Sequence, residues 1–287
     1  MSDAGTRDLY VTANGLRHHL IARGRPGAPV VLMIHGLTQQ AHVFDPVASK
    51  LAKRFHVYAL DVRGRGESDW GPPDEYRLDV YVRDLAELRN ALGLERFAIV
   101  GTSMGGLIGL LFADERPEAV WGLVLNDVGP EIAPAGLERI RRMLESMPEA
   151  FPDLKAVVRW YREANAPVLA GRSDDEVAEY ARWHVRKADT GLLVWKLDPA
   201  IRTAPPAPPP KDLWEAFRGV PCPVLVIRGR ESDVLTKETA DRMAREHPRC
   251  TVVEVPKVGH APSLTESDAY TALEQFLSAA APTSESR

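Results

Sequence analysis

The sequence has few of the residues that build disulfide or metal sites. Its 287 residues include two cysteines, Cys222 and Cys250, with no C-x-x-C pair and no cluster of cysteine and histidine. This excludes a disulfide framework and gives no support for a zinc site. We therefore expect two unpaired thiols in the core, no metal and no cofactor.

An excess of positive charge and long apolar runs are also missing. The formal net charge is -4 and no dense run of Lys and Arg occurs, which argues against nucleic acid as the main partner. The chain starts with a polar stretch, 1–6, and no apolar run approaches membrane-spanning length. We expect a cytoplasmic protein that does not bind membranes and acts as a monomer or homodimer on a small molecule.

What the sequence does contain is an alternation of short apolar runs with helical patterns. An opening hairpin is predicted around Asn14-Gly15, because Asn-Gly is a strong turn signal between two strands. Six further apolar runs are predicted as strands, and the first of them is typical of a strand buried on both faces: 30–34, 55–60, 97–100, 120–125, 224–227 and 251–255. The pattern predicts an α/β protein with a mostly parallel, eight-stranded twisted sheet and helices on both faces.

The alternation stops between Glu131 and Lys211, where we expect helices and no strand. This segment ends in a proline-rich stretch, 205–210, which is typical of a stiff extended spacer. A helical insertion after the sixth strand is most simply a cap over the strand ends. The expected organisation is 1–130 for the first part of the core, 131–211 for the cap, 212–281 for the second part of the core and 282–287 for a disordered tail.

The stretch Gly101–Gly106 (GTSMGG) joins a predicted strand to an apolar helix. Gly101 and Gly105 flank Ser103 at a spacing that allows a sharp strand-to-helix turn. Such a turn would hold the Ser103 hydroxyl out at its tip as a nucleophile. The backbone N–H of Met104, at the start of the helix, would face a developing oxyanion.

Two further side chains follow later predicted strands and would complete a catalytic triad. Ligands collect beyond the carboxyl ends of parallel strands, and His260 follows the last strand, where it would act as general base. Asp233 follows the preceding strand and gives the order Ser, Asp, His, so we favour it as the partner of His260. Asp127, after the strand next to the turn, and Glu231 are the alternatives, with Asp127 the main one.

The segment His35-Gly36-Leu37-Thr38 follows a central strand and points to a second oxyanion donor. Gly36 would let the N–H of Leu37 turn toward the site, beside that of Met104. For His35 itself we expect a structural role.

Together these motifs resemble the α/β-hydrolase superfamily. The residues that carry the resemblance are His35-Gly36, Asp61-x-Arg63-Gly64-x-Gly66-x-Ser68, Gly101-x-Ser103-x-Gly105-Gly106, Ser232-Asp233 and Gly259-His260. The resemblance is closest to capped serine esterases, lactonases and carbon–carbon bond hydrolases. It implies that the Arg-Gly-x-Gly turn is structural, so Arg63 and Arg65 have no catalytic role. Serine at the nucleophile position argues against haloalkane dehalogenases and epoxide hydrolases, which carry aspartate there.

The sequence therefore predicts a serine hydrolase that transfers the acyl group of a small or medium ester or lactone to water. The predicted cap carries Trp160, Tyr161, Trp183 and Trp195, which would line an apolar acyl pocket or simply form the core of the cap. Two alternatives remain open. One is a carbon–carbon bond hydrolase of a diketone or ring-cleavage product with the same triad, and the other is a non-catalytic ligand receptor.

Overall fold

The computed structural model describes residues 5–164, 173–203 and 207–282. Its main sheet has eight strands in the order β1-β2-β4-β3-β5-β6-β10-β11. The first two strands are antiparallel to their neighbours and the remaining six are parallel to one another. The strands are β1 (Arg7–Ala13), β2 (Leu16–Arg23), β3 (Val30–Ile34), β4 (His56–Leu60), β5 (Phe97–Thr102), β6 (Val120–Asn126), β10 (Val224–Gly229) and β11 (Cys250–Val255).

The sequence prediction of an eight-stranded, mostly parallel sheet is thus confirmed. The opening hairpin turns at Asn14-Gly15, and both residues take the positive φ that a two-residue turn of this kind requires. The five strands in the middle of the sheet, from β4 to β10, are buried at almost every position, which explains why their sequences are apolar without alternation.

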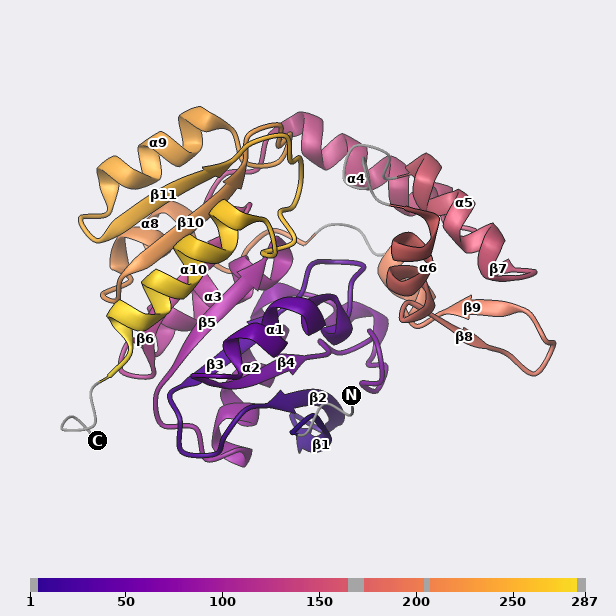
Figure 1. Ribbon diagram of the computed structural model, residues 1–287, viewed down its shortest axis with the longest axis horizontal. Helices are drawn as coiled ribbons and strands as arrows, with labels where there is room; N and C mark the ends of the chain where they lie inside the picture. The colour runs from indigo at the N-terminus through magenta and orange to yellow at the C-terminus, as the bar shows by residue number, and fades with distance from the viewer. Residues whose placement is uncertain (1–4, 165–172, 204–206, 283–287) are drawn as a thin grey trace.

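Helices cover both faces of the sheet (Figure 1). Helices α1 (Asp45–Leu51) and α10 (Ser267–Ala280) contribute to one core cluster. The second cluster, on the opposite face, takes its helical residues from α2 (Leu78–Ala91), α3 (Met104–Glu115), α8 (Leu213–Gly219) and α9 (Lys237–Glu246). Two 3₁₀ turns complete this part of the chain, η1 (Ala41–Phe44) and η2 (Pro73–Glu75). Cys222 and Cys250 are unpaired, and burial raises the pKa of each thiol to about 12.

The elements between β6 and α8, which we call the insert, stand beside the sheet in Figure 1. Their side chains form a third core cluster. The insert is not wholly helical, which corrects the expectation of no strand, because it holds a small sheet in the order β7-β9-β8. These strands are only two or three residues long, too short to show a period in the sequence. The insert consists of α4 (Pro134–Ser146), β7 (Ala150–Phe151), α5 (Leu154–Ala164), α6 (Asp174–Arg182), β8 (Val185–Lys187), β9 (Leu193–Trp195) and α7 (Pro199–Thr203).

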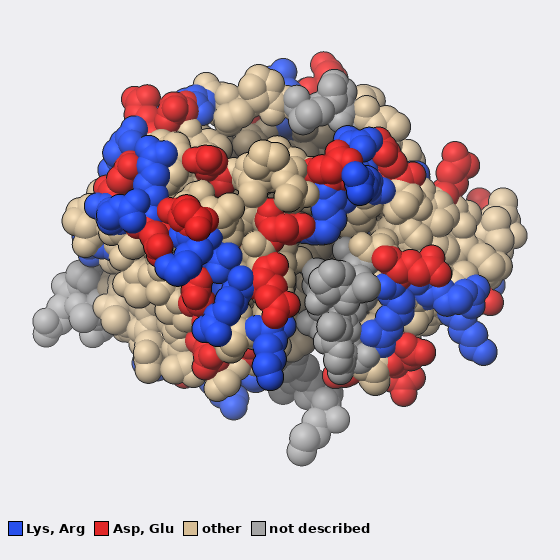
Figure 2. Space-filling view, turned by 90° about the horizontal axis from the view of Figure 1, so that it is seen from above, with Lys and Arg blue, Asp and Glu red and all other residues tan. Residues whose placement is uncertain are grey.

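Two sequence predictions fall largely outside the described residues. The expected disordered tail, 282–287, is described only at Pro282, and the proline-rich spacer, 205–210, only from residue 207. Across the described ranges, no helix combines the length and the apolar character needed to cross a membrane. On the face of the molecule shown in Figure 2, Lys and Arg side chains are interspersed with Asp and Glu, in keeping with the small net charge.

The turn that carries Arg63 and Arg65 joins the insert to the core. The N–H of Gly66 donates to the carbonyl of Lys196 at 2.9 Å, and the N–H of Asp198 donates to the carbonyl of Gly64 at 2.9 Å. Both arginines are fully buried. Arg63 donates from Nε and Nη2 to the two carboxylate oxygens of Asp84, at 2.6 and 2.5 Å. These contacts support the structural role that the resemblance implied for the turn.

Replacing Asp84 with alanine should destabilise the fold strongly, because it leaves the buried Arg63 guanidinium without its two-point partner. We expect the free energy of unfolding to fall by about 3 to 5 kcal/mol. Asp79→Ala is the matched control on the same helix, since its ion pair with Arg77 lies at the surface and should change stability by less than about 1 kcal/mol. Urea unfolding followed by circular dichroism measures both. Equal losses in the two variants would contradict this interpretation of the turn.

Candidate functional site

Ser103 lies at the tip of a sharp turn between β5 and α3. Its backbone has φ 51° and ψ -118°, a region that residues other than glycine rarely occupy. The turn depends on two glycines. A Cβ atom at Gly101 would overlap the carbonyl of Gly105, and one at Gly105 would overlap the carbonyl of Ile34 at the end of β3. The close approach of strand, turn and helix therefore fixes the direction in which the Ser103 side chain points.

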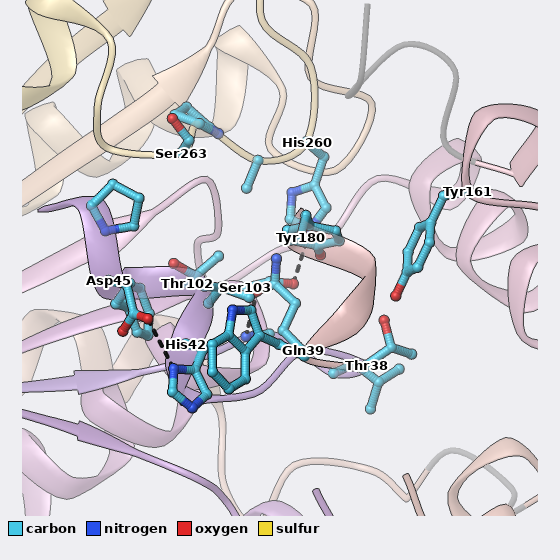
Figure 3. Close-up of a pocket in the computed structure, with 18 of the residues that line it drawn as sticks. Thr38, Gln39, His42, Asp45, Thr102, Ser103, Tyr161, Tyr180, His260 and Ser263 are labelled. Carbon is cyan, nitrogen blue, oxygen red and sulfur yellow. Dashed lines mark hydrogen bonds and ion pairs between the residues drawn. The ribbon is translucent and has the colours of Figure 1, made fainter. Parts of the chain in front are cut away.

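His260 reaches Ser103 from the loop after β11. Its Nε2 lies 3.0 Å from Ser103 Oγ, and its Nδ1 lies 2.7 Å from Asp127 Oδ2 (Figure 3 shows the contact with Ser103). The Asp127 side chain is fully buried, and that of His260 is 11% exposed. A carboxylate accepts the proton on Nδ1, so Nε2 is left to accept from the serine hydroxyl. This is the arrangement that a histidine needs to remove a proton from a hydroxyl group.

The expected partner of His260 was Asp233, and the structure instead places Asp127 at its Nδ1. Asp127 Oδ1 accepts from the N–H of Gly229 at 2.8 Å, and Oδ2 also accepts from Ser232 Oγ at 2.5 Å. Three contacts, two from the end of β10 and its following loop and one from the loop after β11, thus hold the carboxylate in a buried site. Asp127 was the main alternative in the sequence analysis.

Asp233 is turned toward a different partner. Arg139, on helix α4 of the insert, donates from Nε and Nη2 to its two carboxylate oxygens, at 2.5 and 2.9 Å. Burial raises the pKa of Asp233, but the hydrogen bonds and charge of Arg139 outweigh it, and the net pKa lies below the ordinary value. Glu231, the remaining candidate, is exposed.

Leu37 and Met104, the predicted oxyanion residues, each have a backbone N–H with no partner among the described residues. The Leu37 carbonyl is held by Arg65, whose Nε donates to it at 3.1 Å, and Arg65 Nη2 lies 3.5 Å from the Met104 sulfur. Gln39 Oε1 accepts from the N–H of Gly36 at 3.0 Å. The loop that carries Leu37 is therefore fixed at two of its residues.

His35 has the structural position that we expected. It is fully buried, its Nδ1 donates to the carbonyl of Gly36 at 2.8 Å, and its Nε2 accepts from the N–H of Val62 at 3.0 Å. Burial lowers the pKa of His35 to about 4, so the ring is neutral near pH 7.

A cavity of about 940 Å³ opens over Ser103 and His260. All four aromatic residues singled out in the sequence line it, namely Trp160, Tyr161, Trp183 and Trp195. In Figure 3, Tyr161 lies to one side of Ser103, and Asp45 and Ser263 lie to the other. The other lining residues include Ile140, Met143 and Met147 of the insert and Arg23, Ser49, Thr265 and Glu266 of the core.

Trp183 forms a direct contact between the insert and the core. Its ring stacks on His42, with 3.6 Å between the ring centroids and 16° between the planes. His42 Nδ1 lies 2.8 Å from Asp45 Oδ2, which fixes the imidazole from its other side. The stack forms part of the cavity wall near Ser103.

Sequence reasoning missed several polar residues that support the site. Asn126 donates from its amide to Thr102 Oγ1 at 3.0 Å and to the carbonyl of Pro262 at 2.9 Å, and so links β5 to the loop of His260. Ser232 donates to Asp127, and Arg139 donates to Asp233. Their sequence signal is only a position at a strand end or on a helix face. Within the described ranges, no three His, Cys, Asp or Glu side chains gather closely enough to ligate a metal ion.

Several known proteins are similar to this one over most of its length. The 3-hydroxybutyrate-oligomer hydrolase of Cupriavidus necator is 36% identical over 90% of this chain and 91% of its own length. N-formylmaleamate deformylase of Pseudomonas putida is 29% identical over 87% of this chain and 88% of its own. The crystal structure of an alpha/beta hydrolase from Novosphingobium aromaticivorans superimposes with a TM-score of 0.88 at 35% identity, covering 97% of this chain and 99% of that one.

Residues 29–267 also match the model of the alpha/beta hydrolase fold family, which spans the serine turn, the strand-end loops and the insert. The order of the sheet, the position of Ser103 and the extent of the match agree with one another. The chain therefore belongs to the alpha/beta hydrolase fold family, and it is a hydrolase of that fold.

Proposed function

We propose that this protein is a serine hydrolase that cleaves a carboxylic ester through an acyl-enzyme on Ser103. The observation that carries the proposal is the continuous contact from Ser103 Oγ to His260 Nε2 and from His260 Nδ1 to the buried carboxylate of Asp127. In this proposal 131–211 acts as a cap that supplies the cavity wall, and 1–130 and 212–281 form the catalytic core.

The proposed reaction has two halves. Ser103 Oγ attacks the carbonyl carbon while His260 Nε2 takes the hydroxyl proton, and Asp127 stabilises the imidazolium that forms. The N–H groups of Leu37 and Met104 donate to the oxyanion. The intermediate collapses when His260 gives the proton to the leaving alcohol, so that an acyl-serine remains. Water, deprotonated by His260, then attacks the acyl-serine and releases the carboxylic acid and free Ser103.

The choice of an ester over other acyl compounds rests on two supports. The relative with 36% identity is named for hydrolysis of an oligomer of a hydroxy acid. The cavity has the volume of a small-molecule site and is lined by both aromatic and polar side chains. We therefore propose an ester, or lactone, of small or medium size, with the apolar portion against Tyr161 and Trp195.

Hydrolysis of an amide-type bond is the second candidate. Its support is the relative named N-formylmaleamate deformylase, together with 2-(acetamidomethylene)succinate hydrolase of Mesorhizobium japonicum, which is 30% identical over 84% of this chain. The same nucleophile, base and oxyanion donors serve both bonds, because the two reactions differ mainly in the leaving group that His260 protonates.

Replacing Ser103 with alanine should remove the nucleophile and lower kcat for p-nitrophenyl butyrate by roughly 10⁴-fold or more. Ser278→Ala, the same change on the distant helix α10, is the control and should leave kcat within about twofold. A fluorophosphonate probe should label the wild type and the control, and should not label Ser103→Ala. Unlabelled wild-type protein without ester hydrolysis would favour the non-catalytic receptor.

The two acids are distinguished by separate substitution with asparagine. Asp127→Asn should lower kcat by about 10³- to 10⁴-fold. The neutral amide of asparagine lacks the negative charge that stabilises the imidazolium of His260. Asp233→Asn should change kcat at the pH optimum by less than about tenfold, since its carboxylate binds Arg139 and not His260. Steady-state kinetics of the two purified variants tests this, and a larger loss at Asp233 would reverse the assignment.

A panel of substrates decides the bond that is cleaved. We expect kcat/KM to be highest for p-nitrophenyl esters of about four to eight carbons, to fall by roughly tenfold at twelve, and to exceed that of the matched anilide by about 100-fold. A lactone and a 1,3-diketone complete the panel. Turnover of the diketone without turnover of esters would indicate the carbon–carbon bond hydrolase, and a preference for the anilide would indicate the amide reaction.

A further inference from the structure

The Arg139–Asp233 ion pair joins the insert to the loop after β10. The same loop also binds the side chain of Asp127 through Ser232. Asp233 follows Ser232, whose hydroxyl binds Asp127, so adjacent residues contact the partner of His260 and the insert. The side chains of Arg139 and Asp233 are 28% and 33% exposed, which makes the pair partly buried. Both Arg139 and His260 line the cavity.

One face of α4 docks on this loop. The N–H of Ala133, just before the helix, donates to the carbonyl of Val234 at 3.0 Å. A Cβ atom at Gly136 would lie 2.6 Å from the carbonyl oxygen of Asp233, so the backbones of helix and loop are in close contact. Arg139 follows three residues later on the same face. The ion pair is thus the third of three successive contacts along this face, after those of Ala133 and Gly136.

The next face of α4 forms part of the cavity wall. Ile140, Met143 and, just after the helix, Met147 line the cavity beside Arg139. A change in the position of α4 would therefore move the cavity wall and the Arg139 guanidinium together. Such a movement would also separate the Arg139 guanidinium from the Asp233 carboxylate, and so change the charges near His260.

The charges of this pair act on His260 with opposite signs. The negative charge of Asp233, in the loop whose Ser232 binds Asp127, would favour protonation of His260. The positive charge of Arg139 opposes this effect. While the two side chains are paired their effects largely cancel, and loss of either partner leaves the other uncompensated.

We propose that Arg139 and Asp233 are a pair of positioning residues that makes the basicity of His260 depend on the docking of the insert. The inference rests on the proposed role of His260 as general base. Neither side chain touches the reacting atoms. The chemistry stays with Ser103, His260 and Asp127, while separation of the pair changes the pH at which His260 accepts a proton.

Other charged groups surround His260 and do not change in the test below. Asp127 binds it directly, and Glu231 lies in the same loop as Asp233. The remaining titratable or charged residues among those that line the cavity are Arg23, His42, Asp45, Tyr161, Glu176, Glu179, Tyr180 and Glu266. Because they are present in every variant, differences between variants report the pair itself.

The experiment compares Arg139→Gln, Asp233→Asn and the double variant. Arg139→Gln leaves the negative charge of Asp233, so the acidic limb of the kcat/KM profile should shift to higher pH by roughly half a unit. Asp233→Asn leaves the positive charge of Arg139 and should shift it to lower pH by a similar amount. The double variant should return to within about 0.2 unit of the wild type.

Arg142→Gln is the matched control, because Arg142 lies on the same helix and pairs at the surface with Glu138. It should leave the limb unchanged. An NMR titration of the His260 imidazole in the free protein should show the same order of pKa values without any substrate. Shifts of one sign in both single variants, or no shift in either, would overturn the inference. If activity does not depend on Ser103, the proposed function fails, and the NMR titration still tests the pair by itself.

Discussion

The buried carboxylate of Asp127 is the interaction on which the arrangement of the site depends. It lies after β6, accepts from the backbone at the end of β10 through Gly229, from the following loop through Ser232, and faces the loop after β11 through His260. Three separate segments therefore take their relative positions from one side chain. A carboxyl group with no exposure is tolerated because each of its oxygens has a donor. The position of His260 over Ser103 follows from this network.

Most of the site could be predicted because its residues depend on local rules. The serine turn is set by two glycines at fixed spacing, and the apolar strands and the Asn14-Gly15 turn each carry their own pattern. The choice between Asp127 and Asp233 has no local rule. Their strands, β6 and β10, are parallel neighbours, so both acids emerge at the same edge of the sheet. The partner of Asp233 is Arg139, 94 residues away, and no pattern around either residue reveals that contact.

The insert was harder to predict for a related reason. Helices were expected throughout it, but its strands are too short for a pattern, and β7 pairs with β9 across the intervening helices α5 and α6. Its attachment to the core uses backbone groups at Gly64 and Gly66, whose partners at Asp198 and Lys196 lie far along the chain and have no sequence signal of their own. The sequence left open whether the four aromatic residues line the cavity or form the core of the insert. All four line the cavity, and Tyr161 and Trp195 also belong to the buried core of the insert.

Arg65 has a consequence for mutational scanning of this protein. The proposed oxyanion donors at Leu37 and Met104 are backbone N–H groups, so alanine substitution there would report packing and leave the donors in place. Arg65 holds the Leu37 carbonyl and contacts the Met104 side chain while remaining fully buried. In an alanine scan, a loss of activity at Arg65 would therefore reflect displacement of the two backbone N–H donors. Replacing the amides of Leu37 and Met104 with backbone esters is the change that tests the donors themselves.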